Sequence, residues 1–285
     1  LRKNKVAMVS LFVIIVVMIF SFIVPAFYPY DYKTQIKGSE NLHPMQYSEK
    51  EIERMDAGEK VFPHVLGTDK MGRDYAIRVM MGSRISLLVG LIATAIIFVI
   101  GSLIGSISAF FGGWVDLIIM RIVDIISTIP LTLYVILIMQ VLGAGIQSII
   151  VALGSVYWVD MARVVRGQIL SLKQQEFVLA AKTIGSSATT ILFDHLIPNA
   201  LGSILVTITM LIPSAIFMEA FLGYLGIGLQ PPLASLGTMC NDASANLRTS
   251  PHELLIPALM ICVIMFAFNF VGDGLRDALD PKLKK

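Results

Sequence analysis

Residues 85–115 read ISLLVGLIATAIIFVIGSLIGSISAFFGGWV, a run that contains no charged side chain. A bilayer's hydrocarbon core is about 30 Å thick and a helix rises about 1.5 Å per residue, so about 20 apolar residues suffice to cross it. This run is therefore predicted to be a membrane-spanning helix with some tilt. The rest of the chain agrees, because 56% of its 285 residues are hydrophobic and only 15% are charged, against about 25% charged in soluble domains. The composition indicates an all-α integral membrane protein.

Five more spans are expected from the other charge-free runs. The first, 6–30, ends in an aromatic belt and lacks a small-residue cleavage pattern, so it is expected to remain as an anchor. Residues 125–159 are too many for one span, and Gly143-Ala144-Gly145 is predicted to break them into an antiparallel pair. The runs 195–218 and 254–272 complete six transmembrane helices.

Six spans place both termini on one side of the membrane, and basic residues near span ends tend to be cytoplasmic. The termini are therefore predicted to be cytoplasmic, although the loop 31–84 on the opposite side is also rich in basic residues. That loop is long and equally rich in acidic residues, a case in which the rule weakens. The basic residues that favour this orientation are Arg2, Lys3, Lys5, Arg163, Arg166, Lys173, Lys182, Arg276, Lys282, Lys284 and Lys285.

This topology divides the chain into four parts. Residues 1–30 hold the cytoplasmic tail and helix 1, 31–84 a polar extracytoplasmic loop, 85–272 the core with helices 2–6, and 273–285 a cytoplasmic tail. Within the polar loop, Ser48 stands three residues before Glu51, which predicts a short helix with a capping box. Segment 220–248 is too rich in Gly and Pro for a regular span and is predicted to be re-entrant or to lie at the surface.

The sequence offers no catalytic or metal site. Gly67 to Gly72 has the spacing of a phosphate loop, but Arg73 and Asp74 follow where Lys and Ser or Thr are required. His252-Glu253 begins a zinc-protease pattern, yet Ile256 occupies the position of the second histidine. A net charge of +2 gives no nucleic-acid surface. We expect neither an enzyme nor a nucleic-acid-binding protein.

Five charged residues within or beside the spans are candidates for a role in transport. Two pairs stand three residues apart, so each can meet on one helix face. One interpretation is a proton or ion relay, which would make the chain a proton-coupled secondary transporter using Asp124 and Asp160; the preferred one is mutual neutralisation at a helix contact. The fifth residue, Glu219, either lines a pathway or marks the end of a span. The pairs are Arg121 with Asp124 and Asp160 with Arg163.

The segment 173–199 predicts two short helices on the cytoplasmic side. Apolar residues recur at helical spacing, Gly185 supplies a left-handed stop, and Ser186-Ser187 can cap a second helix before Pro198 opens the fifth span. Such helices must bury their apolar face on another protein or on the membrane surface, and small residues favour close helix docking. The apolar set is Phe177, Ala180, Ala181, Ile184 and Ala188.

At this segment the chain resembles the membrane permeases of bacterial ATP-binding-cassette importers. Their cytosolic loop has the pattern Glu-Ala-Ala, three residues, Gly, nine residues, Ile-x-Leu-Pro. Residues 176–181, EFVLAA, and 195–199, HLIPN, are similar to the variant found in the second permease subunit of dipeptide and oligopeptide systems. The matching positions are Ala180, Ala181, Gly185 and Pro198, and the departures are Leu179, His195 and Ile197.

The resemblance extends in a consistent order from Leu66 to Lys282. It is carried by Leu66-Gly67-Thr68-Asp69 with Gly72-Arg73-Asp74, Met120-Arg121 with Asp124 and Pro130, Ala162-Arg163 with Val165-Arg166-Gly167, Glu219-Ala220 with Leu225-Gly226, Gln230-Pro231-Pro232, and Gly272-Asp273-Gly274-Leu275-Arg276-Asp277 with Leu279-Asp280-Pro281.

The resemblance implies the type I fold of ABC importer permeases in the bacterial cell membrane. The chain would form half of a pore with a homologous permease, and two ATPase subunits that bind ATP and magnesium would supply the energy, with no cofactor in this chain. An external binding protein would deliver a peptide, or alternatively nickel or another small solute handled by the same family. The loop 167–197 would dock on an ATPase subunit through Glu176, Phe177, Ala180, Ala181 and Gly185, with Pro198 at its end.

Overall fold

The computed structural model describes residues 4–279 and shows helices joined by turns and one long polar segment. The single β pairing within these residues is an isolated bridge between Thr68 and Asp74. The helices are α1 Lys5–Phe22, η1 Val24–Ala26, α2 Glu49–Asp56, α3 Tyr75–Phe111, α4 Gly113–Ser127, α5 Leu131–Leu142, α6 Ile146–Lys173, α7 Glu176–Thr183, α8 Ala188–Thr190, the π-helical turn η2 Ile191–Leu196, α9 Ile197–Tyr224, α10 Leu236–Ser244 and α11 Pro251–Leu279.

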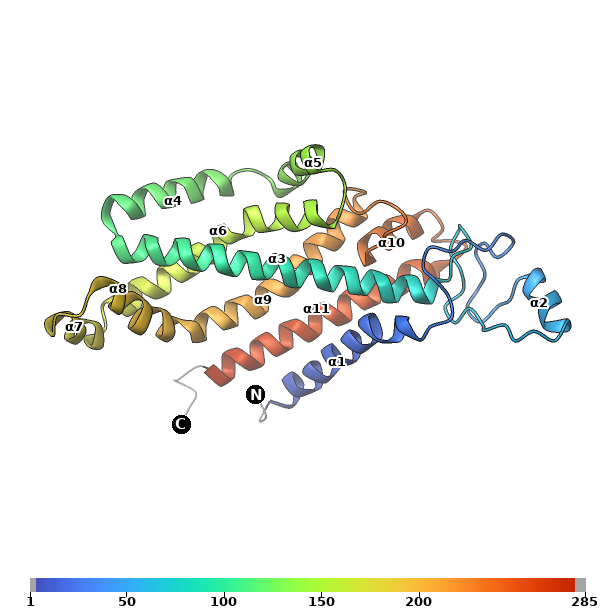
Figure 1. Ribbon diagram of the computed structural model, residues 1–285, viewed down its shortest axis with the longest axis horizontal. Helices are drawn as coiled ribbons and strands as arrows, with labels where there is room; N and C mark the ends of the chain where they lie inside the picture. The colour runs from blue at the N-terminus through green and yellow to red at the C-terminus, as the bar shows by residue number, and fades with distance from the viewer. Residues whose placement is uncertain (1–3, 280–285) are drawn as a thin grey trace.

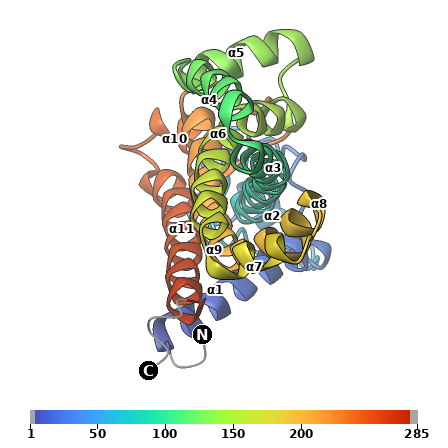
Figure 2. The same cartoon turned by 90° about the vertical axis from the view of Figure 1, so that its left-hand side faces the viewer.

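The long helices run roughly along one direction, with α2 and the polar segment at one end of the molecule and α7 and α8 at the other (Figure 1). The end-on view shows α4 and α5 on one side of α3 and α6, and α1 on the opposite side (Figure 2). The two ends of the described chain meet, since Asn4 Nδ2 donates to Asp277 Oδ2 at 3.4 Å. Both terminal helices therefore reach the same side of the bundle.

Five helical segments of the described chain are long and apolar enough to cross a membrane: Lys5–Ala26, α3, α6, η2 with α9, and α11. The pair α4 and α5 forms a sixth candidate span that is bent by 85°. The expected number of six spans agrees with this count when the bent pair is one span. The fold is that of an all-α membrane protein.

The third span differs from its prediction. Its helix begins at Gly113 and not at Ile125, so it includes Asp116, Arg121 and Asp124, which precede the predicted start. It stops at Ser127 and resumes at Leu131, because Pro130 lacks an N–H and disfavours helical geometry in the residue before it. The predicted break at 143–145 is confirmed, with α5 ending at Leu142 and α6 starting at Ile146.

Two other helices extend beyond the charge-free runs. Helix α3 begins at Tyr75, where Asp74 caps it by accepting a hydrogen bond from the Ile77 amide at 3.0 Å, so the polar segment ends ten residues before Arg84. Arg78 is buried inside this helix and lies 3.3 Å from Asp69. Helix α9 continues through Glu219 to Tyr224. A charged residue with a polar partner inside the protein can therefore lie within a helix, so it does not mark where the helix ends.

Helices α3 and α6 pack closely through glycine. A Cβ at Gly101 would lie 2.6 Å from Met161 Cβ, and one at Gly105 would lie 2.5 Å from the Ala162 carbonyl oxygen. Small residues let backbones approach in this way, which matters in a membrane because lipid gives no hydrophobic drive for helix association. Helices α4, α5 and α9 pack on the α3–α6 pair, and α11 packs on α9.

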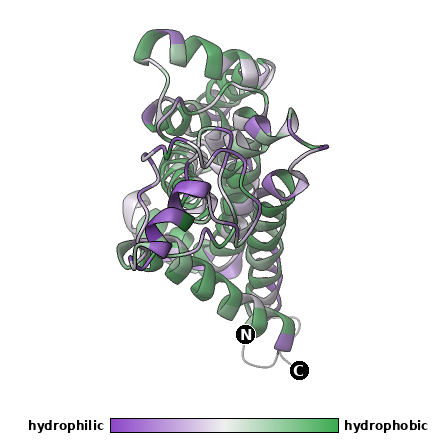
Figure 3. Ribbon diagram, turned by 90° about the vertical axis from the view of Figure 1, so that its right-hand side faces the viewer, coloured by the Kyte–Doolittle hydropathy of each residue, from purple (hydrophilic) through white to green (hydrophobic). Residues whose placement is uncertain are grey.

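The polar end carries the predicted short helix. Helix α2 has the predicted capping box between Ser48 and Glu51. Figure 3 views the molecule from this end and shows α2 as a mostly hydrophilic helix. In the segment 225–250, α10 is too short to span and packs on α9, where a Cβ at Gly237 would collide with the Ala220 carbonyl. The prediction that segment 220–248 is no regular span holds from residue 225 onward, whereas residues 220–224 belong to α9.

Candidate functional site

The first of the two short helices predicted between α6 and α9 is present, whereas the second, α8, is only three residues long and continues through η2 into α9 without a break. Helix α7 covers Glu176–Thr183, and Gly185 ends it with φ of +82° while its amide donates to the Lys182 carbonyl at 3.0 Å. Ser187 Oγ accepts a hydrogen bond from the Thr190 amide at 3.1 Å, which caps α8 as expected. Pro198 lies in the first turn of α9.

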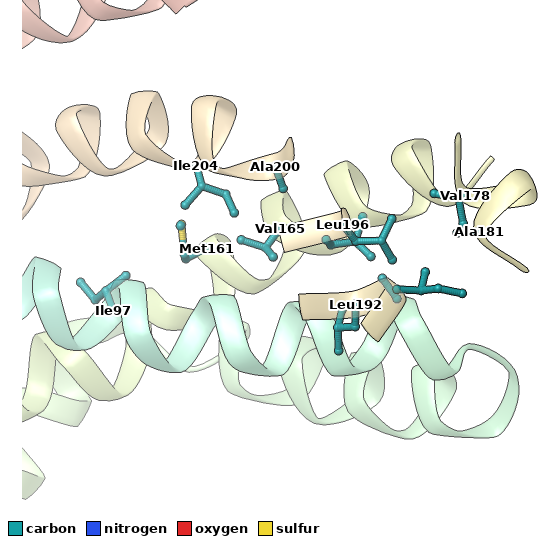
Figure 4. Close-up of a cluster of buried hydrophobic side chains, with 12 residues drawn as sticks. Ile97, Met161, Val165, Val178, Ala181, Leu192, Leu196, Ala200 and Ile204 are labelled. Atoms are coloured by element: carbon teal, nitrogen blue, oxygen red, sulfur yellow. The ribbon is translucent and has the colours of Figure 1, made fainter. Parts of the chain in front are cut away.

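One side of α7 is buried against the rest of this chain. Val178 and Ala181 pack in an apolar cluster with Leu192 and Leu196 of η2 and with Val165 of α6 (Figure 4). Ala181 is only 5% exposed. It had been assigned to the same face as Phe177 and Ala180, and the structure corrects this assignment. Ala181 packs α7 against the helix bundle, so its side chain cannot contact a partner protein.

The side of α7 next to this buried one is apolar and exposed. Phe177, Ala180 and Ile184 are spaced by three and four residues, so they share one face. Ile184 is 81% exposed and Leu179, beside this face, is 54% exposed. Glu176 and Lys182 add charges at the two ends of the helix. We call Phe177, Ala180 and Ile184 the outer face of α7; it can bury apolar area only against another surface.

Just before α7 in the chain, the C-terminal end of α6 makes polar contacts with α3 and α4. Arg166 of α6 donates two hydrogen bonds to the Asp116 carboxylate of α4, at 2.5 and 2.6 Å. Ser108 of α3 donates to the same carboxylate. Lys173, the last residue of α6, donates to the carbonyls of Ala109 and Phe110 at 3.3 and 2.7 Å, where α3 ends. No local sequence pattern predicts this junction, because its members are up to 64 positions apart.

The four paired charges predicted on helix faces come together between α4 and α6. Arg163 lies 3.3 Å from Asp160 on its own helix and 3.1 Å from Asp124 on α4, and Arg121 lies 3.9 Å from Asp124. Both expected pairs form, and Arg163 also joins the two helices. Arg121 remains 74% exposed and Asp160 65% exposed.

Glu219 lies apart from these charges. It had been placed just after a span, but it is inside α9 and 1% exposed. Ser86 Oγ of α3 donates to its carboxylate at 2.7 Å, and the Leu236 amide at the start of α10 donates to the same Ser86 oxygen at 3.4 Å. Glu219 therefore stands at the junction of three helices and does not mark an interface.

No three His, Cys, Asp or Glu side chains among residues 4–279 are grouped so that they could hold a metal ion. The notable features of the described residues are instead the ion pairs that join α4 to α6 and the exposed apolar outer face of α7. Such features suit a subunit that changes shape in contact with a partner.

The comparisons with known proteins decide the family. Residues 98–285 match the family described as binding-protein-dependent transport system inner membrane component, which covers more than half of the chain. The chain belongs to this family. Residues 1–44 also match the N-terminal transmembrane domain of oligopeptide transport permease C. This binding-protein-dependent transport component is thus a multi-pass permease subunit of the cell membrane and not an enzyme.

Two relatives align along the whole chain. The oligopeptide transport system permease protein OppC of Bacillus subtilis (strain 168) is 47% identical over 284 residues, which are 100% of this chain and 88% of the relative. The dipeptide transport system permease protein DppC of the same strain is 42% identical over 286 residues, 100% of this chain and 84% of that one. A glutathione permease, GsiD of Pectobacterium atrosepticum, is 41% identical over 78% of this chain and 73% of its own.

A solved structure supports the fold. A chain of the methionine ABC transporter MetNI in an inward-facing conformation superposes with a TM-score of 0.60 at 19% identity, covering 70% of this chain and 94% of that one. The transport component therefore has the type I fold of ABC importer permeases, as expected. Partners of the ATPase and binding-protein classes follow from membership of the family.

Proposed function

We propose that the chain imports peptides as one half of a heterodimeric transmembrane pore, driven by two ATPase subunits. The main support for this proposal is the sequence identity of 42 to 47% to dipeptide and oligopeptide permeases along the full chain. The exposed apolar outer face of α7 is consistent with a partner subunit that covers it. A homologous permease supplies the other half of the pore, and ATP and magnesium bind in the ATPase subunits.

The outer face of α7 is the proposed coupling surface, inserted into a groove of an ATPase subunit. Phe177, Ala180 and Ile184 make the contact, and Glu176 lies at the N-terminal end of the helix. Gly185 is needed for the turn because its φ of +82° is unfavourable for other residues. Ala181 and Pro198 hold the loop from within the permease. Closure of the ATPase pair then pushes α7 and shifts the pore between two states.

The proposed orientation places α7 and both termini in the cytoplasm and the segment 31–74 outside, where it faces the external binding protein. The Asn4–Asp277 contact supports a common side for the termini, and α2 and α7 lie at opposite ends of the molecule (Figure 1). Arg2, Lys3, Lys282, Lys284 and Lys285, which favour this orientation by charge, lie outside the described residues.

We assign Arg121, Asp124, Asp160 and Arg163 to helix pairing, because each acid lies within 4 Å of an arginine. Glu219 joins α3 and α9 and is not assigned to the pathway. The rival function is proton-coupled secondary transport through Asp124 and Asp160. In that case uptake would need a proton gradient and no ATP, and Asp124→Asn with Asp160→Asn would abolish it.

The test uses the complete transporter, with its second permease, ATPase pair and binding protein, in proteoliposomes. We expect ATP-dependent uptake of radiolabelled tri- and tetrapeptides, little affected by a proton uncoupler. Uptake driven by the proton gradient without ATP would overturn the proposal. ATP-driven uptake of nickel with no peptide uptake would keep the permease assignment and replace the substrate.

Two neighbouring alanines test the coupling surface. Ala180→Arg puts a charge on the exposed outer face, so we expect normal folding but uncoupled ATP hydrolysis and at least about fivefold less uptake. Ala181→Arg puts the same charge into the apolar cluster, so we expect loss of the folded loop and poor assembly. Normal uptake by a correctly assembled Ala180→Arg transporter would contradict the assignment of the outer face.

A further inference from the structure

The junction where α6 ends shows how a push on α7 could reach the rest of the permease. Only Gln174 and Gln175 separate α6 from α7. The inner side of α7 packs through Val178 and Ala181 on the apolar cluster that includes Val165 of α6. Helix α7 is therefore joined to the end of α6 by a two-residue connection and, through η2, by a shared apolar cluster, so the two should move as one body.

Helix α4 packs on α6 and α3 along one side only, through an apolar cluster in which Val123 meets Trp158, Val159 and Ala162 of α6. Val123 is its one fully buried residue, and one long side of the helix is exposed. Gly112 and Gly113, both with positive φ, separate it from α3, and Pro130 separates it from α5. Apolar packing is not directional, so a helix with breaks at both ends can still shift on its neighbours unless directional contacts fix its position.

Those contacts are ionic and lie at two levels. The Asp116–Arg166 pair is the nearer one to α7 and is two-pronged, with both hydrogen bonds shorter than 2.7 Å. The Asp124–Arg163 pair joins the same two helices further along, at 3.1 Å, with both side chains more exposed. Planar arginine–carboxylate pairs with two hydrogen bonds fix orientation as well as distance.

Asp116 also contacts a third helix, α3. Ser108, in the last turn of α3, donates to the Asp116 carboxylate, and Lys173 of α6 donates to the last carbonyls of α3. The ends of α3 and α6 and the start of α4 therefore meet at one point, directly beside the loop that carries α7. We call Asp116, Arg166, Ser108 and Lys173 the α6 joint.

We propose that the α6 joint, through the Asp116–Arg166 pair, is the element that transmits movement of α7 to α4 and so to the bent span α4–α5. Asp116 and Arg166 are positioning residues, which act through α4 and do not touch substrate. The inference rests on the proposed function for the role of α7 and adds the path by which its displacement leaves the loop.

The experiment compares Asp116→Asn with Asp124→Asn in the assembled transporter in proteoliposomes. Both remove one carboxylate charge from α4 opposite an arginine of α6, so Asp124→Asn is the matched control. We expect Asp116→Asn to keep basal ATP hydrolysis while uptake per ATP hydrolysed falls about fivefold or more, within the usual range of coupling factors. Asp124→Asn should change that ratio by less than about twofold.

Charge reversal gives a second genetic readout. Arg166→Asp alone should uncouple the transporter, and combining it with Asp116→Arg should restore part of the uptake-to-hydrolysis ratio, which a simple packing role would not do. Equal loss in Asp116→Asn and Asp124→Asn, or no loss in either, would overturn the joint. If Ala180→Arg uncouples the transporter while Asp116→Asn does not, the coupling surface stands and the joint alone fails.

A distance measurement keeps the inference testable if a variant assembles poorly. Spin labels at Ile118→Cys on α4 and Lys182→Cys on α7, both exposed positions, are introduced in a Cys262→Ser background that leaves Cys240 buried. In the otherwise unaltered transporter, we expect the distance between the labels to stay the same with and without bound nucleotide. A nucleotide-dependent change in that distance would show that α4 and α7 move separately and would overturn the proposal.

Discussion

His64 shows how a single buried side chain organises the polar segment. It is fully buried, with Nε2 at 3.0 Å from Glu51 of α2 and Nδ1 at 2.8 Å from Asp74, the cap of α3. The Tyr30 ring stacks on it with 4.4 Å between ring centroids. Because both ring nitrogens face carboxylates, the arrangement favours a doubly protonated, positively charged imidazole. Its charge holds α2 to the start of α3.

The charges around His64 make this contact dependent on pH. Burial opposes the charged form, but hydrogen bonds and charges from Asp74 and Glu51 outweigh it and raise the pKa of His64. For Glu51, burial is likewise outweighed by hydrogen bonds from Ser48 and the charge of His64, which lower its pKa. Burial raises the pKa of Tyr30 to about 12, so Tyr30 stays neutral across this range.

We therefore predict that segment 31–74 loosens on the alkaline side. A raised histidine pKa gives stability that is complete below about pH 6.5 and is lost as the pH rises through the raised value. The lowered pKa of Glu51 gives stability that is lost only as the pH falls through that low value. Hydrogen exchange of the segment in the purified transporter, corrected for the intrinsic rate, should show faster exchange at alkaline pH.

Two variants check this interpretation. His64→Gln should cost about 3 kcal/mol of local stability at neutral pH, because it leaves two buried carboxylates without their cation. Arg54→Ala, on α2, breaks an exposed pair with Glu59, which follows the helix, and should cost less than about 1 kcal/mol. Exchange that is independent of pH, or equal in the two variants, would argue against a charged His64.

At the scale of helices, glycines set the approach of α3 to α6. Gly105→Ala should destabilise the chain by about 1 to 3 kcal/mol, because the new Cβ would lie 2.5 Å from a backbone oxygen that cannot move aside. Gly167→Ala on α6 has open space around it and should be neutral or stabilising by up to about 1 kcal/mol. Thermal unfolding in detergent measures both, and similar melting temperatures would contradict the close packing.

Sequence patterns predicted the helices that are set by local chemistry. The capping box of α2, the glycine stop after α7 and the glycine break before α6 each depend on residues within a few positions of one another. Charge-free runs also predicted the number of spans. They misplaced the ends of α3, α4 and α9, because Arg78, Asp116 and Glu219 lie inside helices with partners up to 133 residues away.

Helix α7 shows another limit of periodicity. Spacing indicates that residues share a side, but it does not say whether that side meets the same chain or a partner. Ala180 and Ala181 are neighbours in the sequence, yet one is exposed and the other is buried against η2 and α6. The contact between Arg166 and Asp116 was missed for a related reason, since the two residues are 50 positions apart.

At the scale of the whole molecule, the opposite positions of α2 and α7 predict opposite labelling. In a Cys262→Ser background, Met55→Cys on α2 should react with a membrane-impermeant maleimide in intact cells, after removal of any outer barrier. Lys182→Cys on α7 should react only after the membrane is opened. Both positions are exposed in the structure, so exposure does not account for a difference. The reverse pattern would invert the proposed orientation.

The uncovered face of α7 also bears on the lifetime of the subunit. A chain made in excess of its ATPase would leave Ile184 and Phe177 in contact with water, at a site that we propose is covered by the ATPase in the complex. Chaperones and proteases act on such apolar surfaces. Orphan copies should therefore be degraded faster than assembled ones, and the cell would match the amounts of the two subunits by turnover as well as by synthesis.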